Sequence, residues 1–96
     1  MDISRLQAQL QVEVDTAFLY HSIAAIQEDQ SLFRVLEALA KIEEGHAQHM
    51  LGELQKVNPN YKMPSPSRRA KLQLRLGKIF GYSSIISSLA SVEKQF

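Results

Sequence analysis

The chain has 96 residues, a formal net charge of +1 and no cysteine. This length predicts one small domain with a single modest core, to which a partner subunit would add stability. The absence of cysteine excludes disulfides, thiolate zinc sites, cysteine-ligated iron–sulfur centres and a cysteine nucleophile. Any metal must therefore be held by Glu, Asp and His.

Charge and hydropathy favour a cytoplasmic protein. The basic residues are scattered except for a short cluster at Arg68, Arg69 and Lys71, which is too little to predict a nucleic-acid partner. The amino terminus has no basic segment leading into an apolar run, and no stretch approaches the ~20 apolar residues of a membrane span. The sequence ends inside an expected helix. We therefore expect either a whole protein or one piece of a longer protein.

A long first helix is expected from residue 2 to about residue 27, which contain no Gly or Pro. Apolar residues occupy more than one side of this helix, so neighbours should surround it. One stripe at helical spacing has a single carboxylate in an otherwise apolar line: Leu6, Leu10, Glu13, Ala17, Tyr20 and Ala24. Asp15 points away from this stripe and is expected to be solvated.

The polar residues 28–31 predict a tight turn, with Asp29 or Ser31 as N-cap of a second helix over residues 32–56. So short a connection makes residues 2–56 an antiparallel hairpin. Gly45 and Gly52 weaken the second helix by ~1 kcal/mol each relative to alanine and would let another helix come close.

The remaining chain predicts a proline-rich loop at 57–66 and C-terminal helices within 67–96. Residues 67–80 have the pattern of a short basic amphipathic helix that stops at Gly81. A last helix begins at Ser83 or Ser84 and carries Glu93 on its apolar line. The fold class is all-α, and the 96 residues form one domain.

The second helix carries the most informative pattern. Its core stripe contains a carboxylate and an imidazole: Leu36, Leu39, Glu43, His46, Met50 and Leu54. A buried carboxylate costs several kcal/mol unless something pairs with it, so Glu43 calls for a partner such as a cation. The adjacent Glu44 falls on a solvated face with Glu37, Lys41 and Gln48.

Glu13 is expected at the same level as Glu43 and His46. With a rise of ~1.5 Å per residue, Glu13 and Glu43 lie at heights along the hairpin that differ by only ~3 Å. Carboxylate and imidazole ligands suit iron, manganese or zinc. The residues alone also leave open a metal-free helical dimerisation domain, in which Glu43 pairs with a basic side chain or is protonated.

The pattern of Glu13, Ala17 and Tyr20, followed about thirty residues later by LAKIEEGHAQHM, resembles the first half of a ferritin-like domain of the rubrerythrin group. The segment RLGKIFGYSSIISSLASVE is also similar to rubrerythrin-like domains that precede a vacuolar-iron-transporter-type membrane region. The resemblance implies a four-helix bundle with two metal ions, iron above all. By this resemblance, Glu13 is the one glutamate ligand that the first helix contributes, Glu43 is the bridging carboxylate and His46 is the imidazole ligand. Glu93 would be the ligand from the third helix.

The family's full site needs two Glu-x-x-His motifs, whereas this sequence has one. Either two chains pair about a twofold axis to complete one bundle, as a homodimer or within a higher homo-oligomer, or a fourth helix lies outside the sequence.

Three other residues have two interpretations each. Glu93 is either this third-helix ligand or a residue at the end of a helix without a role in the site. Tyr20 is a hydrogen-bond partner of a ligand carboxylate or an ordinary buried tyrosine. His49 is expected either to support the site, as a hydrogen-bond partner of a ligand or an auxiliary ligand, or to be a partly exposed flank residue, and His21 is expected to be structural.

The resemblance implies Fe(II) oxidation by dioxygen or peroxide, of ferroxidase or peroxidase type, or iron capture for storage. It names no catalytic residue beyond the metal ligands and no organic cofactor. An alternative is an iron-sensing or regulatory module, without turnover, that partners a membrane iron-transporter domain.

Overall fold

The computed structural model describes residues 2–83, 85–87 and 89 of the chain. Three helices are present: α1 (Ile3–Ala24), α2 (Gln30–Val57) and α3 (Arg68–Phe80). Residues 83, 85–87 and 89 are helical as well, and no described residue lies in a strand. The all-α prediction is therefore confirmed.

Short polar side chains set where the helices begin. The side chains of Asp2, Asp29 and Ser67 each accept a hydrogen bond from a backbone N–H in the first turn of the helix that follows. Asp29, rather than Ser31, is thus the cap of α2. At the end of α3, Gly81 has a φ of 96°, a conformation that glycine adopts without steric cost and that stops the helix where the sequence predicts.

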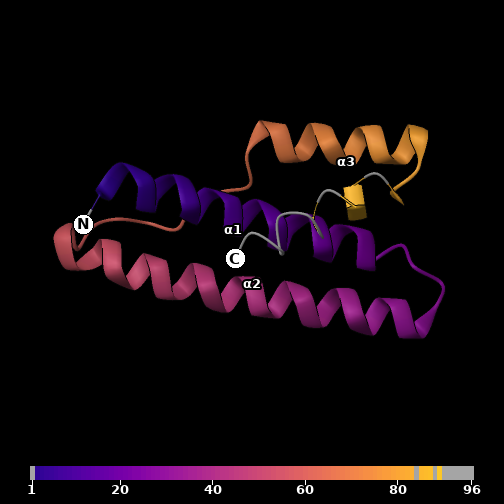
Figure 1. Ribbon diagram of the computed structural model, residues 1–96, viewed down its shortest axis with the longest axis horizontal. Helices are drawn as coiled ribbons and strands as arrows, with labels where there is room; N and C mark the ends of the chain where they lie inside the picture. Colours follow the sequence, from indigo (N-terminus) through magenta and orange to yellow (C-terminus); the bar gives the residue numbers. More distant parts are fainter. Residues whose placement is uncertain (1, 84, 88, 90–96) are drawn as a thin grey trace.

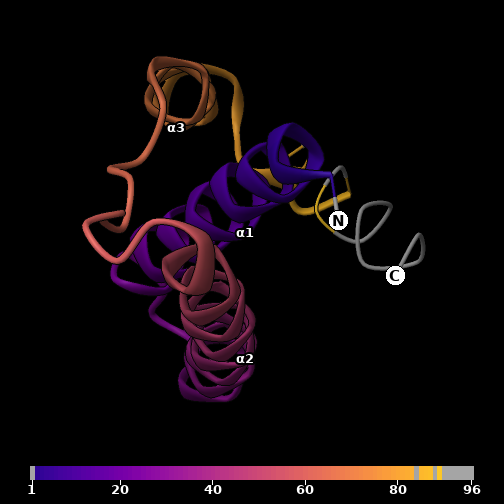
Figure 2. The same ribbon diagram turned by 90° about the vertical axis from the view of Figure 1, so that its left-hand side faces the viewer.

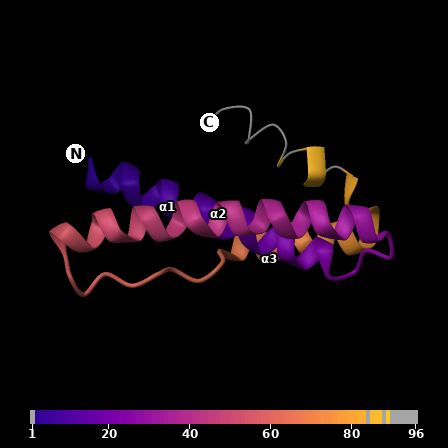
Figure 3. The ribbon, with the colours of Figure 1, turned by 90° about the horizontal axis from the view of Figure 1, so that it is seen from below.

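The central element is α1, with α2 antiparallel to it on one side and α3 on the other (Figures 1 and 2). The connection after α2 returns from the end of that helix to the start of α3, as the view from below shows (Figure 3). The expectation that neighbours surround the first helix is confirmed for its contacts with α2 and α3.

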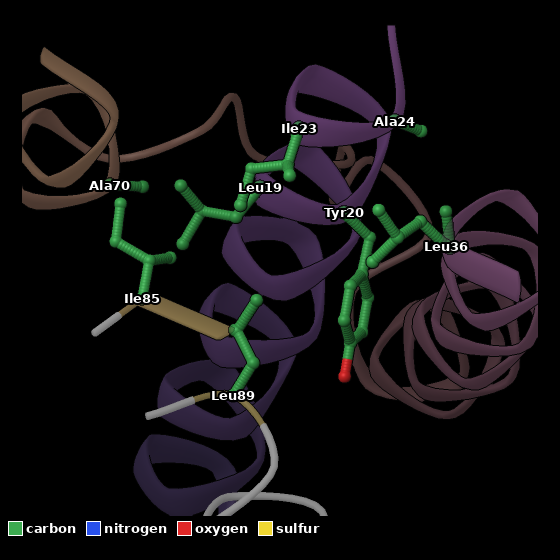
Figure 4. Close-up of a cluster of buried hydrophobic side chains, with 9 residues drawn as sticks. Leu19, Tyr20, Ile23, Ala24, Leu36, Ala70, Ile85 and Leu89 are labelled. Atoms are coloured by element: carbon green, nitrogen blue, oxygen red, sulfur yellow. The ribbon is translucent and has the colours of Figure 1, made fainter. Parts of the chain in front are cut away.

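Two apolar clusters form the core, one toward each end of the hairpin. The cluster at the turn end includes Leu19, Tyr20 and Ala40, and residues of α3 and the segment after it pack against it (Figure 4). The cluster at the open end is built on Leu10, Ala47 and Leu54. The level between them holds two buried glutamates, Glu13 and Glu43.

Asp15 anchors the returning chain to α1. Its carboxylate accepts hydrogen bonds from the backbone N–H of Ser67 at 2.8 Å and from the Ser67 hydroxyl at 2.6 Å. The expectation that Asp15 is solvated is corrected: the side chain is half-buried and accepts these bonds where the chain returns to α1. One side chain thus fixes where α3 begins.

Among the described residues, no helix has both the length and the apolar content that crossing a bilayer requires. The longest, α2, has 28 residues but carries charged side chains along its length.

The glycines of α2 give a direct test of this helix. A Cβ added at Gly45 or Gly52 would meet no heavy atom within 4 Å. We expect Gly45→Ala and Gly52→Ala each to raise the free energy of unfolding by ~1 kcal/mol, since alanine loses less backbone entropy in a helix. Urea unfolding followed by circular dichroism measures the change, and a loss of stability in both variants would contradict the helix packing described here.

Candidate metal centre

Three side chains from α1 and α2 meet between the two core clusters. The Nδ1 atom of His46 lies 3.6 Å from Oε2 of Glu13 and 3.6 Å from Oε2 of Glu43. One ligand atom of each residue lies within 4.8 Å of the other two. The predicted meeting of Glu13 with Glu43 and His46 is therefore found.

Helical periodicity accounts for this meeting. Glu43 and His46 are three residues apart and so share one side of α2, while Glu13 projects from α1 at the same level. Their backbone positions are fixed on both sides by apolar packing, at Leu10 and Ala47 toward one end and at Tyr20 and Ala40 toward the other. The carboxylates are held by rigid elements rather than by loops.

The distances suit a shared cation better than direct hydrogen bonds. A separation of 3.6 Å between nitrogen and oxygen is too long for a hydrogen bond. Metal bonds of about 2.0–2.2 Å at angles of about 90–110° separate neighbouring ligand atoms by roughly 2.8–3.6 Å. The donor set, two carboxylates and one imidazole, fits a divalent transition metal such as iron, manganese or zinc.

Burial is uneven across the group. The side chains of Glu13 and Glu43 are 4% and 6% exposed, whereas that of His46 is 54% exposed. The carboxylates therefore lie in a low-dielectric environment, where two negative charges at this separation repel each other strongly unless a proton or a cation intervenes. The histidine marks the side on which the group opens to solvent.

The other predicted site residues lie as follows. Tyr20 is buried, with its ring between α1 and α2 beside Leu36 (Figure 4). His49 is exposed and does not belong to the three-residue group. Glu93 lies outside the described residues.

A second polar cluster occupies the opposite side of the hairpin. His21 of α1 places Nδ1 3.1 Å from Oε1 of Glu37, and its Nε2 contacts Oε1 of Glu44. Glu44 is exposed, as predicted, but Glu37 is half-buried and both carboxylates contact His21. Sequence reasoning missed these bridges, although a signal existed: Glu37 and Glu44 are seven residues apart, so two turns of α2 present both to one histidine.

This cluster favours the imidazolium form of His21. Partial burial by itself would lower its pKa, but the hydrogen bonds to Glu44 and then to Glu37, together with the negative charge of both carboxylates, raise the pKa above the ordinary value of 6.5. With both ring nitrogens facing carboxylates, only the doubly protonated ring can donate to each of them.

Comparison of this chain with protein-family models, with curated proteins and with solved structures finds no match.

The stability of a Glu43 variant tests whether this carboxylate is a metal ligand or a structural partner of its neighbours. If Glu43 is a metal ligand that lowers the stability of the metal-free chain, Glu43→Leu should raise the free energy of unfolding of that chain by about 1–3 kcal/mol, because it removes the desolvation cost of one buried carboxylate and its repulsion from Glu13. Glu44→Leu, at the exposed neighbouring position, is the matched control and should not be stabilising. Denaturant unfolding in the presence of a chelator makes the measurement, and a destabilised Glu43→Leu chain would show that the carboxylate is a structural partner instead.

The His21 bridges predict a pH dependence of stability. Because the pKa of His21 is raised in the folded chain, its contribution to stability is fully present below about pH 6.5 and is lost as the pH rises through the raised pKa. His21→Gln should therefore lower the free energy of unfolding by up to about 1 kcal/mol near pH 6, and by little near pH 9, since these groups are partly exposed. Equal losses at both pH values would contradict the bridge.

Proposed function

We propose that this protein binds iron at a site built from Glu13, Glu43 and His46. The observation that carries the proposal is the convergence of two buried carboxylates and an imidazole nitrogen within 4.8 Å, at the level between the two apolar clusters of the hairpin. No lysine or arginine belongs to the described three-residue group, whose third member is His46, a residue type that binds transition metals through a ring nitrogen.

A second copy of the chain would complete the site. Three protein ligands leave a transition metal with open positions, and two metal ions need more carboxylate oxygens than one hairpin supplies. Two hairpins related by a twofold axis would bring two sets of Glu13, Glu43 and His46 together and form a four-helix, ferritin-like bundle. The chain would then bind one metal ion per protomer.

The surface beside His46 fits such a partner. Ile42 lies one turn before His46 and Val35 two turns before Ile42, so all three project on the same side of α2. Both aliphatic side chains are more than half exposed. An apolar strip that flanks the open side of the carboxylate group is what a twofold interface would bury.

The chemistry proposed for this site is the oxidation of Fe(II) as substrate. Two Fe(II) ions would each give up one electron to one molecule of dioxygen, which takes up two protons and leaves as hydrogen peroxide. Glu13 and Glu43 would neutralise the positive charge of the ions, and their two oxygens each would allow one or two ions to be bound. The low dielectric around them would strengthen this attraction. His46, at the solvent side, would hold an ion where an oxidant can reach it.

Removal of either ligand type tests metal binding. We expect Glu43→Ala or His46→Ala to abolish tight Fe(II) binding while the chain stays helical, because each removes a donor that no neighbour replaces. Glu44→Ala is the matched control and should bind Fe(II) as the wild type does. Anaerobic equilibrium dialysis with metal analysis gives the binding, and circular dichroism gives the helicity.

Admitting air to the loaded chain, and measuring its mass in solution, separates the competing functions. Fe(II) bound and oxidised by the wild-type chain in air supports an oxidase, whereas Fe(II) bound without oxidation favours a sensing or regulatory module. Unchanged metal content in both ligand variants would reject the site, and a metal-free dimer would favour a helical dimerisation domain.

A further inference from the structure

The outward face of α3 has an apolar stripe that the core does not use. Its side chains follow steps of three and four residues and are all exposed, Ile79 by 72% and Phe80 by 81%: Leu72, Leu76, Ile79 and Phe80. The face of α3 that turns toward the rest of the chain buries Ala70 and Gly77 instead. A surface helix of a globular domain ordinarily turns its large apolar side chains inward, so α3 has the reverse arrangement.

A line of positive charge runs beside this stripe. Lys71, Arg75 and Lys78 each directly precede one of the stripe residues, so they form a neighbouring row along the helix. With Arg68 and Arg69, α3 has five basic residues and no acidic one in thirteen positions. The rest of the chain has six Lys and Arg against ten Asp and Glu, a net charge of −4. The positive charge is thus concentrated on one element.

The position of α3 leaves this face accessible. It lies at the edge of the molecule, on the side of α1 away from α2 (Figure 2). Arg68, Lys71, Leu72 and Arg75 line a shallow surface depression of about 280 Å³ on it. Neither the candidate metal centre nor the aliphatic strip beside His46 shares a residue with this surface.

We infer that α3 docks flat on the surface of a bilayer containing anionic phospholipid. A helix of this composition places its leucine, isoleucine and phenylalanine side chains among the upper acyl chains while its lysine and arginine side chains meet the lipid phosphates. Its 13 residues span only about 20 Å and carry five charges, so it lies in the interface rather than across the membrane.

The apolar stripe and the positive charge of α3 together favour an anionic bilayer over other binding partners. A nucleic acid would engage the basic row but leave Ile79 and Phe80 in water. A second copy docking through α3 would bring two helices of charge +5 together and be repelled. An anionic bilayer satisfies both features at once. This inference is independent of the proposed iron site.

Cosedimentation of the full chain with vesicles tests the inference. We expect binding to vesicles of equal parts phosphatidylglycerol and phosphatidylcholine, little binding to phosphatidylcholine alone, and a weaker affinity as salt rises from about 0.1 M, where screening extends over about 10 Å. The double variant Arg75→Glu, Lys78→Glu should weaken binding by about tenfold or more. Lys62→Glu, an exposed charge reversal outside α3, should bind as the wild type does.

A second pair of variants tests the apolar stripe. Ile79→Ser with Phe80→Ser should weaken vesicle binding by about tenfold or more even though no charge changes, since these side chains provide the inserted apolar surface. Val57→Ser, at an exposed position of α2, is the control. Because all these positions are exposed, the variants should keep the wild-type circular dichroism.

Several outcomes would overturn the inference. These are absence of binding to the anionic vesicles, equal binding to phosphatidylcholine alone, or unchanged binding by both double variants. Binding to a nucleic acid or an acidic polypeptide in place of the vesicles would also reject it in favour of that partner.

Discussion

The structure depends on how two carboxylates are held inside an apolar helix pair. Glu13 and Glu43 are nearly fully buried at one level of the α1–α2 hairpin, between its two apolar clusters. Burying charge is costly, so everything that keeps these residues in place must overcome that cost. The apolar packing on both sides provides this stability, and His46 provides the only opening to solvent within the group.

The rest of the fold can be understood from that constraint. The two clusters fix the hairpin at its ends, the His21 bridges to Glu37 and Glu44 join the helices on the side away from His46, and Asp15 holds the start of α3 on the outer face of α1. The side of the hairpin that carries His46 also carries the exposed Ile42 and Val35. One side of the hairpin thus carries polar contacts between the helices, and the other has an apolar surface beside the group of Glu13, Glu43 and His46.

The hairpin and its three converging side chains could be predicted from the sequence, because helical period and rise fix both the face and the height of a residue. The contacts of His21 and Asp15 could not, since they depend on how each helix is rotated about its axis and where the proline-rich segment returns. The orientation of α3 could not be predicted either, because it also depends on the rotation of the helix about its axis. Its leucines have helical spacing, yet only Leu74 among them packs against the core, and the stripe from Leu72 to Phe80 faces outward.

Native mass spectrometry of the wild-type chain loaded anaerobically with Fe(II) tests the central claim most directly, since it reports metal content and oligomeric state in one measurement. The account predicts a dimer, or a multiple of it, that carries two metal ions per pair of chains and loses them when a chelator is added. A metal-free monomer, observed with Fe(II) in excess, would contradict both the site and its completion by a second copy.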